Sequence, residues 1–183
     1  MSARRSTIMA DLTSQDRLQP SLLDRLIDHE PHSRKESAEA RALTRAELRA
    51  AVLRDLSWLF NATRPEPEPQ SEKTEELERW QQAEYARNSV LNFGLPAFAG
   101  VTLSSMDLEL IQRLVAEAVR RFEPRLDPQT LSIEARVTSQ SHHNTMQLMI
   151  RGQMWAQPVP LELLLAAELD VETGNTRVRD MRG

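Results

Sequence analysis

Three consecutive residues, Glu123, Pro124 and Arg125, are the best candidates for chemistry in this 183-residue chain. They stand where an amphipathic pattern ends, and three hypotheses explain them. Glu123 and Arg125 form an ordinary surface ion pair, or Pro124 holds both charges rigid for a partner to bind. In the third, Glu123 is the acid of a glycosidase, and Asp127 or Asp107 is its second carboxylate. Nearby arginines favour the charged form of Glu123, whereas an acid catalyst must carry a proton.

Other chemical groups are sparse. The chain has no cysteine, which excludes disulfides, thiol nucleophiles and cysteine-ligated metals. His29 and His32 flank a Glu-Pro pair, and the adjacent His142 and His143 would point to opposite sides of an extended chain. A metal would need further ligands from distant segments, so we expect solvated histidines, no metal and no cofactor. The five glycines form neither a Gly-x-Ser-x-Gly elbow nor a phosphate loop.

The net charge of −4 argues against a protein that binds nucleic acid through a basic face. No apolar run approaches the roughly 20 residues needed to span a bilayer. The arginines at positions 4 and 5 are not followed by the apolar segment of a secretion signal. We therefore expect a soluble, cytoplasmic protein without membrane insertion.

The N-terminal part of the chain is predicted to be an extension, residues 1–42, with one short helix. Its first 15 residues are polar and unpatterned, which predicts disorder. Residues 21–28 place four apolar side chains on one helical face directly after Pro20. Residues 33–41 are charged and without period, which is typical of a linker.

Two stronger helices are predicted in residues 43–183, which we expect to form a single domain. Thr44 and Glu47 form a capping box before an apolar stripe that ends near residue 60. A proline-rich and polar insertion follows at about 64–87, with a polar helix over 71–87. The next helix is capped by Ser104 or Ser105 and closes before Pro124. It has the clearest amphipathic pattern in the chain: Leu108, Ile111, Val115, Ala118 and Phe122.

After residue 130 the spacing of hydrophobic residues changes from about three and a half residues, typical of a helix, to two residues, typical of a strand. Residues 131–137 and 146–154 alternate as two strands of a hairpin. Residues 161–171 alternate too, but their composition also favours a helix. A turn at 173–175 and a short strand at 176–179 favour a terminal hairpin. The predicted fold class is α+β: N-terminal helices followed by a small antiparallel β-meander.

Three segments in register resemble a known family: LRAAVLRDLSWLFNATR at 48–64, SVLNFGLP at 89–96 and FEPRL at 122–126. They are similar to TssE, a type VI secretion baseplate component related to a wedge protein of contractile phage tails. The opening SLLDRL at 21–26 also resembles TssE rather than the phage relatives. Two features depart from the family: PAFAG at 96–100 replaces a more usual PDLSG, and the insertion near 65–87 is long.

The resemblance implies a structural subunit rather than a hydrolase, with the glycosidase as the alternative. It implies that Glu123, Pro124 and Arg125 contact wedge proteins, and that alanine at Glu123 or Arg125 spares the fold but abolishes assembly. The small sheet resembles the interlocking domain of the sheath protein, which implies sheath initiation by strand exchange. The implied partners are the wedge proteins TssF, TssG and TssK and the sheath proteins TssB and TssC. The implied place is a cytoplasmic baseplate docked at the inner membrane.

Overall fold

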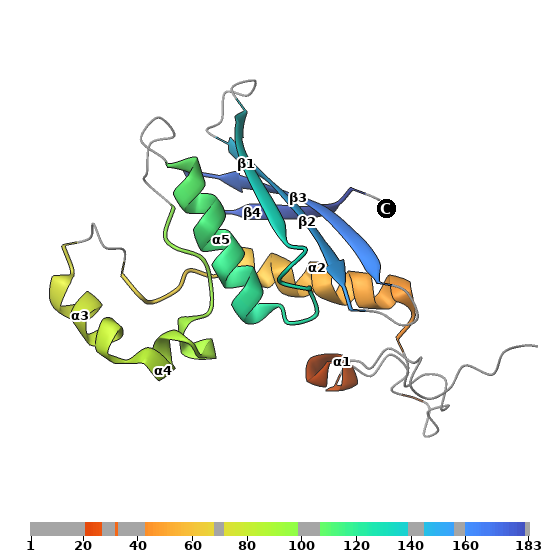
Figure 1. Cartoon of the computed structure of the whole chain (residues 1–183), viewed down its shortest axis with the longest axis horizontal. Coiled ribbons are helices and arrows are strands. Elements are labelled where there is room, and N and C mark those ends of the chain that lie inside the picture. The colour runs from red at the N-terminus through yellow and green to blue at the C-terminus, as the bar shows by residue number, and fades with distance from the viewer. Residues whose placement is uncertain are drawn as a thin grey trace, which may run out of the picture.

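The structure is a computed structural model that describes residues 21–26, 32, 43–67, 72–98, 107–138, 145–155 and 160–181. Helices come first and strands follow, as predicted for an α+β fold (Figure 1). The helical elements are α1 (Leu22–Leu26), α2 (Arg45–Asn61), α3 (Thr74–Gln82), α4 (Glu84–Arg87), the 3-10 helix η2 (Val90–Asn92) and α5 (Leu108–Phe122). The strands are β1 (Ser132–Thr138), β2 (Thr145–Met154), β3 (Leu161–Asp170) and β4 (Thr176–Asp180).

The four strands form one antiparallel meander in the order β1-β2-β3-β4. Residues 161–171, whose sequence was compatible with both a helix and a strand, contain strand β3. This strand pairs with β2 over its full length. Its alternation decides this outcome, because Leu163, Leu165 and Ala167 face the core opposite apolar residues of β2. Pairing and burial therefore override its helical propensity.

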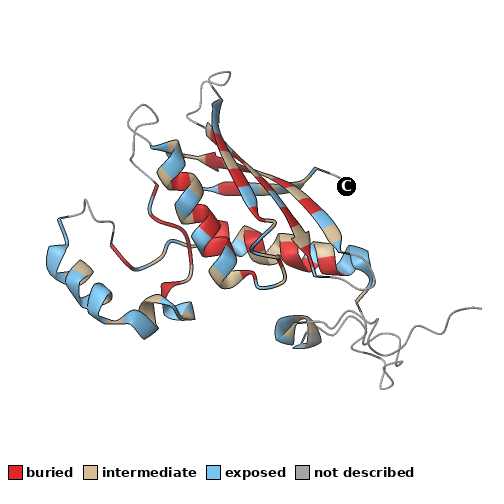
Figure 2. Cartoon of the chain, viewed as in Figure 1, coloured by how far each residue is buried: buried red, intermediate tan, exposed pale blue. Residues whose placement is uncertain are grey.

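Helices α2 and α5 cover one face of the sheet and enclose a single hydrophobic core (Figures 1 and 2). Helix α5 packs on β1, and α2 packs on β4. The apolar stripes expected in both helices are buried, including Val52, Leu56 and Val115. No helix in the described ranges is long and apolar enough to cross a membrane.

The N-terminal ends of α2 and α5 test the capping residues predicted from the sequence. The capping box of α2 forms as predicted, since the Glu47 amide donates to Thr44 Oγ1 at 3.2 Å and the Thr44 amide donates to Glu47 Oε2 at 2.7 Å. Helix α5 is capped by Asp107, whose carboxylate accepts the amides of Glu109 and Leu110. The expected caps Ser104 and Ser105 lie outside the described residues, as do residues 1–15 and 33–41.

The insertion departs from the single polar helix expected over 71–87. The chain breaks at Ala83 into two separate helices, α3 and α4, which bury no residue. We call these two helices the arm. The arm is fastened at its base by Asn92, which is 1% exposed and donates to Glu66 Oε2 at 2.8 Å. Glu66 also accepts from Arg87 Nε at 2.8 Å, and Arg121 of α5 donates to the Arg87 carbonyl. This network of hydrogen bonds positions the arm on the core.

Gly94 lies beside Asn92 and makes a close backbone crossing possible. Its φ of 127° is rare for residues with a side chain, and an added Cβ would lie 2.5 Å from the Ala62 carbonyl oxygen. The crossing is held by backbone bonds from Arg64 to the Leu95 carbonyl and from Leu95 to the Ala62 carbonyl. This explains why a glycine interrupts an otherwise apolar segment.

Replacement of Gly94 by alanine should therefore destabilise the protein by about 2 kcal/mol or more, because strain and a backbone clash add. Gly152→Ala is the matched control, since its added Cβ would meet only side-chain and Cα atoms at 3.8 Å or more. Thermal unfolding followed by circular dichroism measures both variants. Equal losses of melting temperature would contradict the assignment.

Candidate functional site: an arginine held between two carboxylates

Glu123 is the residue at which α5 ends. Its amide still donates to the Val119 carbonyl at 2.9 Å, and the following Pro124 prevents another helical turn. The side chain turns inward and is only 2% exposed. The carboxylate is therefore buried and does not form the ordinary surface ion pair that was one hypothesis from the sequence.

Arg125 supplies the cation that a buried carboxylate requires. Its Nε donates to Glu123 Oε1 at 2.7 Å, and its Nη2 donates to Glu123 Oε2. The Arg125 amide adds a bond of 3.1 Å to Oε1. This bidentate arrangement matches the planar guanidinium to the carboxylate, as expected from the residue types.

Asp55 of α2 is the third member of the site, and sequence reasoning missed it. Its Oδ2 accepts from the same Arg125 Nη2 that binds Glu123. The available signal was its place beside Leu56, where a carboxylate borders the buried stripe of α2. Burial opposes the charge of Arg125, but hydrogen bonds and negative charges from Glu123 and Asp55 outweigh it and raise the pKa of Arg125. We call Asp55, Glu123 and Arg125 the arginine clamp.

The backbone around Arg125 fixes the clamp to the sheet. The Arg125 carbonyl accepts from the Trp155 amide at 2.9 Å, and the Asp127 amide donates to the Gln153 carbonyl at 2.8 Å. Leu126 and Met154 form an isolated antiparallel bridge between these bonds. The clamp therefore joins α2, the end of α5 and the end of β2.

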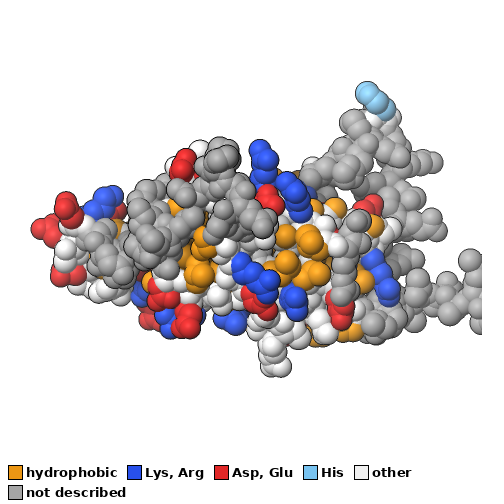
Figure 3. Space-filling model, turned by 90° about the horizontal axis from the view of Figure 1, so that it is seen from above, with side chains coloured by type: hydrophobic (Ala, Val, Ile, Leu, Met, Phe, Trp, Pro, Cys, Tyr) orange, Lys and Arg blue, Asp and Glu red, His pale blue; other side chains and the backbone are white. Residues whose placement is uncertain are grey.

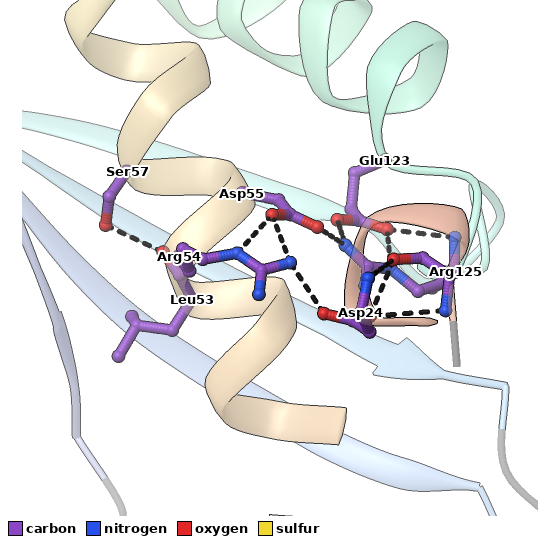
Figure 4. A network of polar contacts seen from close by, with 8 residues as sticks. Asp24, Leu53, Arg54, Asp55, Ser57, Glu123 and Arg125 are labelled. Atoms are coloured by element: carbon purple, nitrogen blue, oxygen red, sulfur yellow. Dashed lines mark hydrogen bonds and ion pairs between the residues drawn. The ribbon is translucent and has the colours of Figure 1, made fainter. Parts of the chain in front are cut away.

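A chain of alternating charges continues from the clamp to α1 (Figure 4). Arg54 Nη2 lies 2.8 Å from Asp55 Oδ1 and 2.8 Å from Asp24 Oδ1. Asp24 also accepts from the Ser21 hydroxyl at 2.6 Å. Burial opposes the charge of Asp24, but the hydrogen bonds from Ser21 and Arg54 and the charge of Arg54 outweigh it and lower its pKa. The short helix α1 is thus held to α2 by charge.

A pocket of about 220 Å³ lies between α1, α2 and the end of α5. Apolar side chains, among them Leu23, Trp58 and Phe122, line it together with Asp55 and Glu123. Arg54 lies over the Trp58 ring at 5.2 Å, so the charged chain borders the pocket. Trp58 stays 52% exposed at this site.

The clamp contains two carboxylates, Glu123 and Asp55, but both bind Arg125, which differs from the acid and second carboxylate of a glycosidase. Glu123 accepts guanidinium hydrogen bonds at both oxygens, so neither oxygen is directed at a substrate. Asp107 caps the other end of α5, about 24 Å from Glu123 at 1.5 Å per residue. Asp127 accepts the Gln129 amide at 2.9 Å in its own turn. The structure therefore brings together Glu123, Pro124 and Arg125, whereas Asp107 lies at the far end of α5 and the Asp127 carboxylate is bound within its own turn.

No cluster of three metal-ligating side chains occurs among the residues that the structure describes. His32 is exposed there. The other three histidines, His29, His142 and His143, lie outside the described residues.

Removal of the Glu123 carboxylate should lower the stability of the folded protein and not only its binding to a partner. Glu123→Ala removes the bidentate partner of the partly buried Arg125 and leaves Asp55 to balance its charge, so we expect a loss of about 3 kcal/mol in unfolding free energy. This replaces the expectation that such a variant keeps its stability. Chemical denaturation measures the effect. Glu75→Ala, in a pair with a 90% exposed carboxylate, is the control and should change little. Similar small effects for both variants would show that the clamp contributes nothing.

Asp24→Asn should loosen α1 without unfolding the core. We expect amides of residues 22–26 to exchange about fivefold faster, since an ion pair of this kind contributes about 1 kcal/mol. Because the pKa of Asp24 is lowered in the folded state, its contribution is present at neutral pH and is lost as pH falls below 3.8. Hydrogen exchange measures both effects. Unchanged exchange in Asp24→Asn would show that other contacts hold α1.

The family model described as baseplate wedge protein gp25 matches residues 46–159. The match runs from the first turn of α2 past the end of β2 and contains the whole arginine clamp. No curated protein and no solved structure matches the chain. The chain therefore belongs to the gp25 baseplate wedge family, which includes TssE, and has a structural role in a phage-tail-like baseplate.

Proposed function

We propose that this chain is the gp25-type subunit of a type VI secretion baseplate and joins wedge proteins to the first ring of sheath. In this role it is not an enzyme and uses no cofactor. It works in the cytoplasm, in a baseplate docked at the inner membrane. The observation that supports the proposal is the family match, which spans the rigid charged corner and the first two strands, β1 and β2, of the small antiparallel sheet.

The sheath side of the proposal rests on the sheet. Its inner face is sealed by α2 and α5, so a new partner must use the open face or an edge. Charged side chains of the open face pair with each other, as in Arg136 with Glu134 at 3.1 Å and Arg179 with Glu168 at 3.6 Å. Seen from above, hydrophobic side chains gather over the sheet between positive and negative groups (Figure 3). Strand addition at an edge would supply main-chain hydrogen bonds as well as side-chain contacts, so we assign TssB and TssC to an edge.

The wedge side of the proposal rests on Arg125. Two of its nitrogens are occupied by Glu123 and Asp55, whereas Nη1 has no hydrogen-bond partner among the described residues. The side chain is 22% exposed, so it lies just below the surface. Nη1 itself is buried, so a carbonyl or carboxylate oxygen of TssF, TssG or TssK would satisfy this donor only when binding displaces the side chains that cover it. Glu123 and Pro124 then act by holding the guanidinium in position.

Co-expression with the wedge proteins tests the proposal. The native chain should elute in one complex with tagged TssF and TssG, and its deletion should abolish TssB–TssC sheath assembly in cells. Arg125→Lys keeps a positive charge between Asp55 and Glu123 but loses the planar fork. We expect it to lose wedge binding by about tenfold or more, because one buried acceptor stays unpaired.

Arg79→Lys is the matched control, because its ion pair is exposed on the arm. Circular dichroism must show that both variants are folded at the assay temperature. Sheath assembly in the absence of the chain, or no wedge complex with the native chain, would contradict the proposal. Release of soluble fragments from purified peptidoglycan by the native chain would support the glycosidase instead.

A further inference from the structure

The sheet has two edge strands, β1 and β4, and helix α2 closes the edge of β4. Asn61 binds the Thr176 backbone twice: its side-chain amide donates to the Thr176 carbonyl, and its side-chain oxygen accepts from the Thr176 amide, each at 2.9 Å. These two groups therefore cannot pair with another strand. Thr176 also donates its hydroxyl to the Phe60 carbonyl.

The other end of β4 is closed by Arg49. Its guanidinium donates to Asp180 at 2.9 Å and to the Glu162 carbonyl at 2.6 Å, where β3 continues beyond its partner. Arg49 and Asn61 are about 18 Å apart along the helix axis at 1.5 Å per residue. The five residues of β4 extend about 17 Å. Helix α2 thus spans the edge of β4 and binds it at both ends.

The hydrogen bonds of the sheet show which groups of β1 face outward. Gln153 of β2 directs its carbonyl to the Asp127 amide and its amide to the Thr130 hydroxyl, on the β1 side. Alternate residues of an antiparallel ladder bond in the same direction, so Glu134 and Arg136 exchange bonds with β2. The amides and carbonyls of the residues between them point away from β2. These residues are Ile133, Ala135 and Val137.

This outward row has no counterpart to Asn61 or Arg49. In the described part of the chain, no side chain binds the outward amides or carbonyls of β1. Val137 is also the one core-facing side chain of β1 that is left open, with 39% exposure against 8% for Ile133 and for Ala135. A strand laid along β1 would pair the row and cover Val137.

We infer that β1 is the edge that receives an incoming strand, and that the β4 edge is closed by α2. The occupant is an extended segment of a sheath subunit with alternating side chains. Its apolar residues lie over the core face beside Val137, and its polar residues lie beside Glu134 and Arg136. The inference deepens the proposed function and rests on it, since it names the surface on which sheath assembly starts.

Proline substitution at one outward position of each edge tests the inference. Val137→Pro removes an outward donor of β1, and Val178→Pro removes an outward donor of β4. Neither amide belongs to the internal ladder, so both variants should fold. In a binding assay with co-expressed TssB–TssC, we expect Val137→Pro to weaken sheath recruitment about tenfold or more and Val178→Pro to leave it within about twofold.

Hydrogen exchange of the unmodified complex gives an independent readout. The amides of Ile133, Ala135 and Val137 should gain protection when the sheath proteins bind, while that of Val178 should not change. This measurement decides the question even if a proline variant fails to fold.

The outcomes separate the inference from the proposed function. If Val178→Pro alone blocks recruitment, or protection appears at β4, the edge assignment is overturned while strand exchange stands. If the native chain recruits sheath but neither edge gains protection, strand addition at both edges is overturned. If the native chain recruits no sheath protein, the proposed function fails as well.

Discussion

The bond between Arg125 and Glu123 is the constraint on which this structure depends. A carboxylate that is 2% exposed cannot remain charged without a strong counter-charge. Pro124 makes the pair possible, because it ends α5 and turns the chain so that the next residue reaches back over Glu123. The same turn brings the Arg125 backbone to the end of β2. One short motif therefore sets the angle between α5 and the sheet.

Helix α2 extends this constraint to the rest of the fold. Asp55 binds the clamp, Arg54 binds α1, and Arg49 and Asn61 bind the edge of β4. Any shift of α2 would break polar contacts in several directions at once, and some of them are partly buried. Apolar packing alone would let the helix slide, since hydrophobic contact is not directional. The polar contacts thus specify the position that burial of Val52 and Leu56 stabilises.

Sequence patterns predicted the elements of this fold well, because α5 and the four strands bury residues at the period of their own secondary structure. The choice between helix and strand for the β3 segment depends on its pairing with β2 and β4, which its own composition does not specify. The burial of Glu123 was not predicted either. Its environment depends on Asp55, 68 positions earlier in the chain, and a motif considered alone looks like a surface turn. The arm was misjudged as one helix, since nothing in its polar sequence marks the break at Ala83.

The two edges of the sheet differ in a way that bears on assembly. An isolated antiparallel sheet with two open edges would add strands on either side and would not limit the growth of an aggregate. Here the polar ends of α2 bind one edge, whereas the other keeps a row of backbone groups that no described side chain binds. Under the proposed function, growth then has one direction, as a subunit that starts a polymer requires. The sheet edge proposed for the sheath, β1, pairs with β2, and the end of β2 is hydrogen-bonded to the backbone of Arg125 and Asp127. A load applied at β1 would therefore reach the charged corner proposed for the wedge directly through β2.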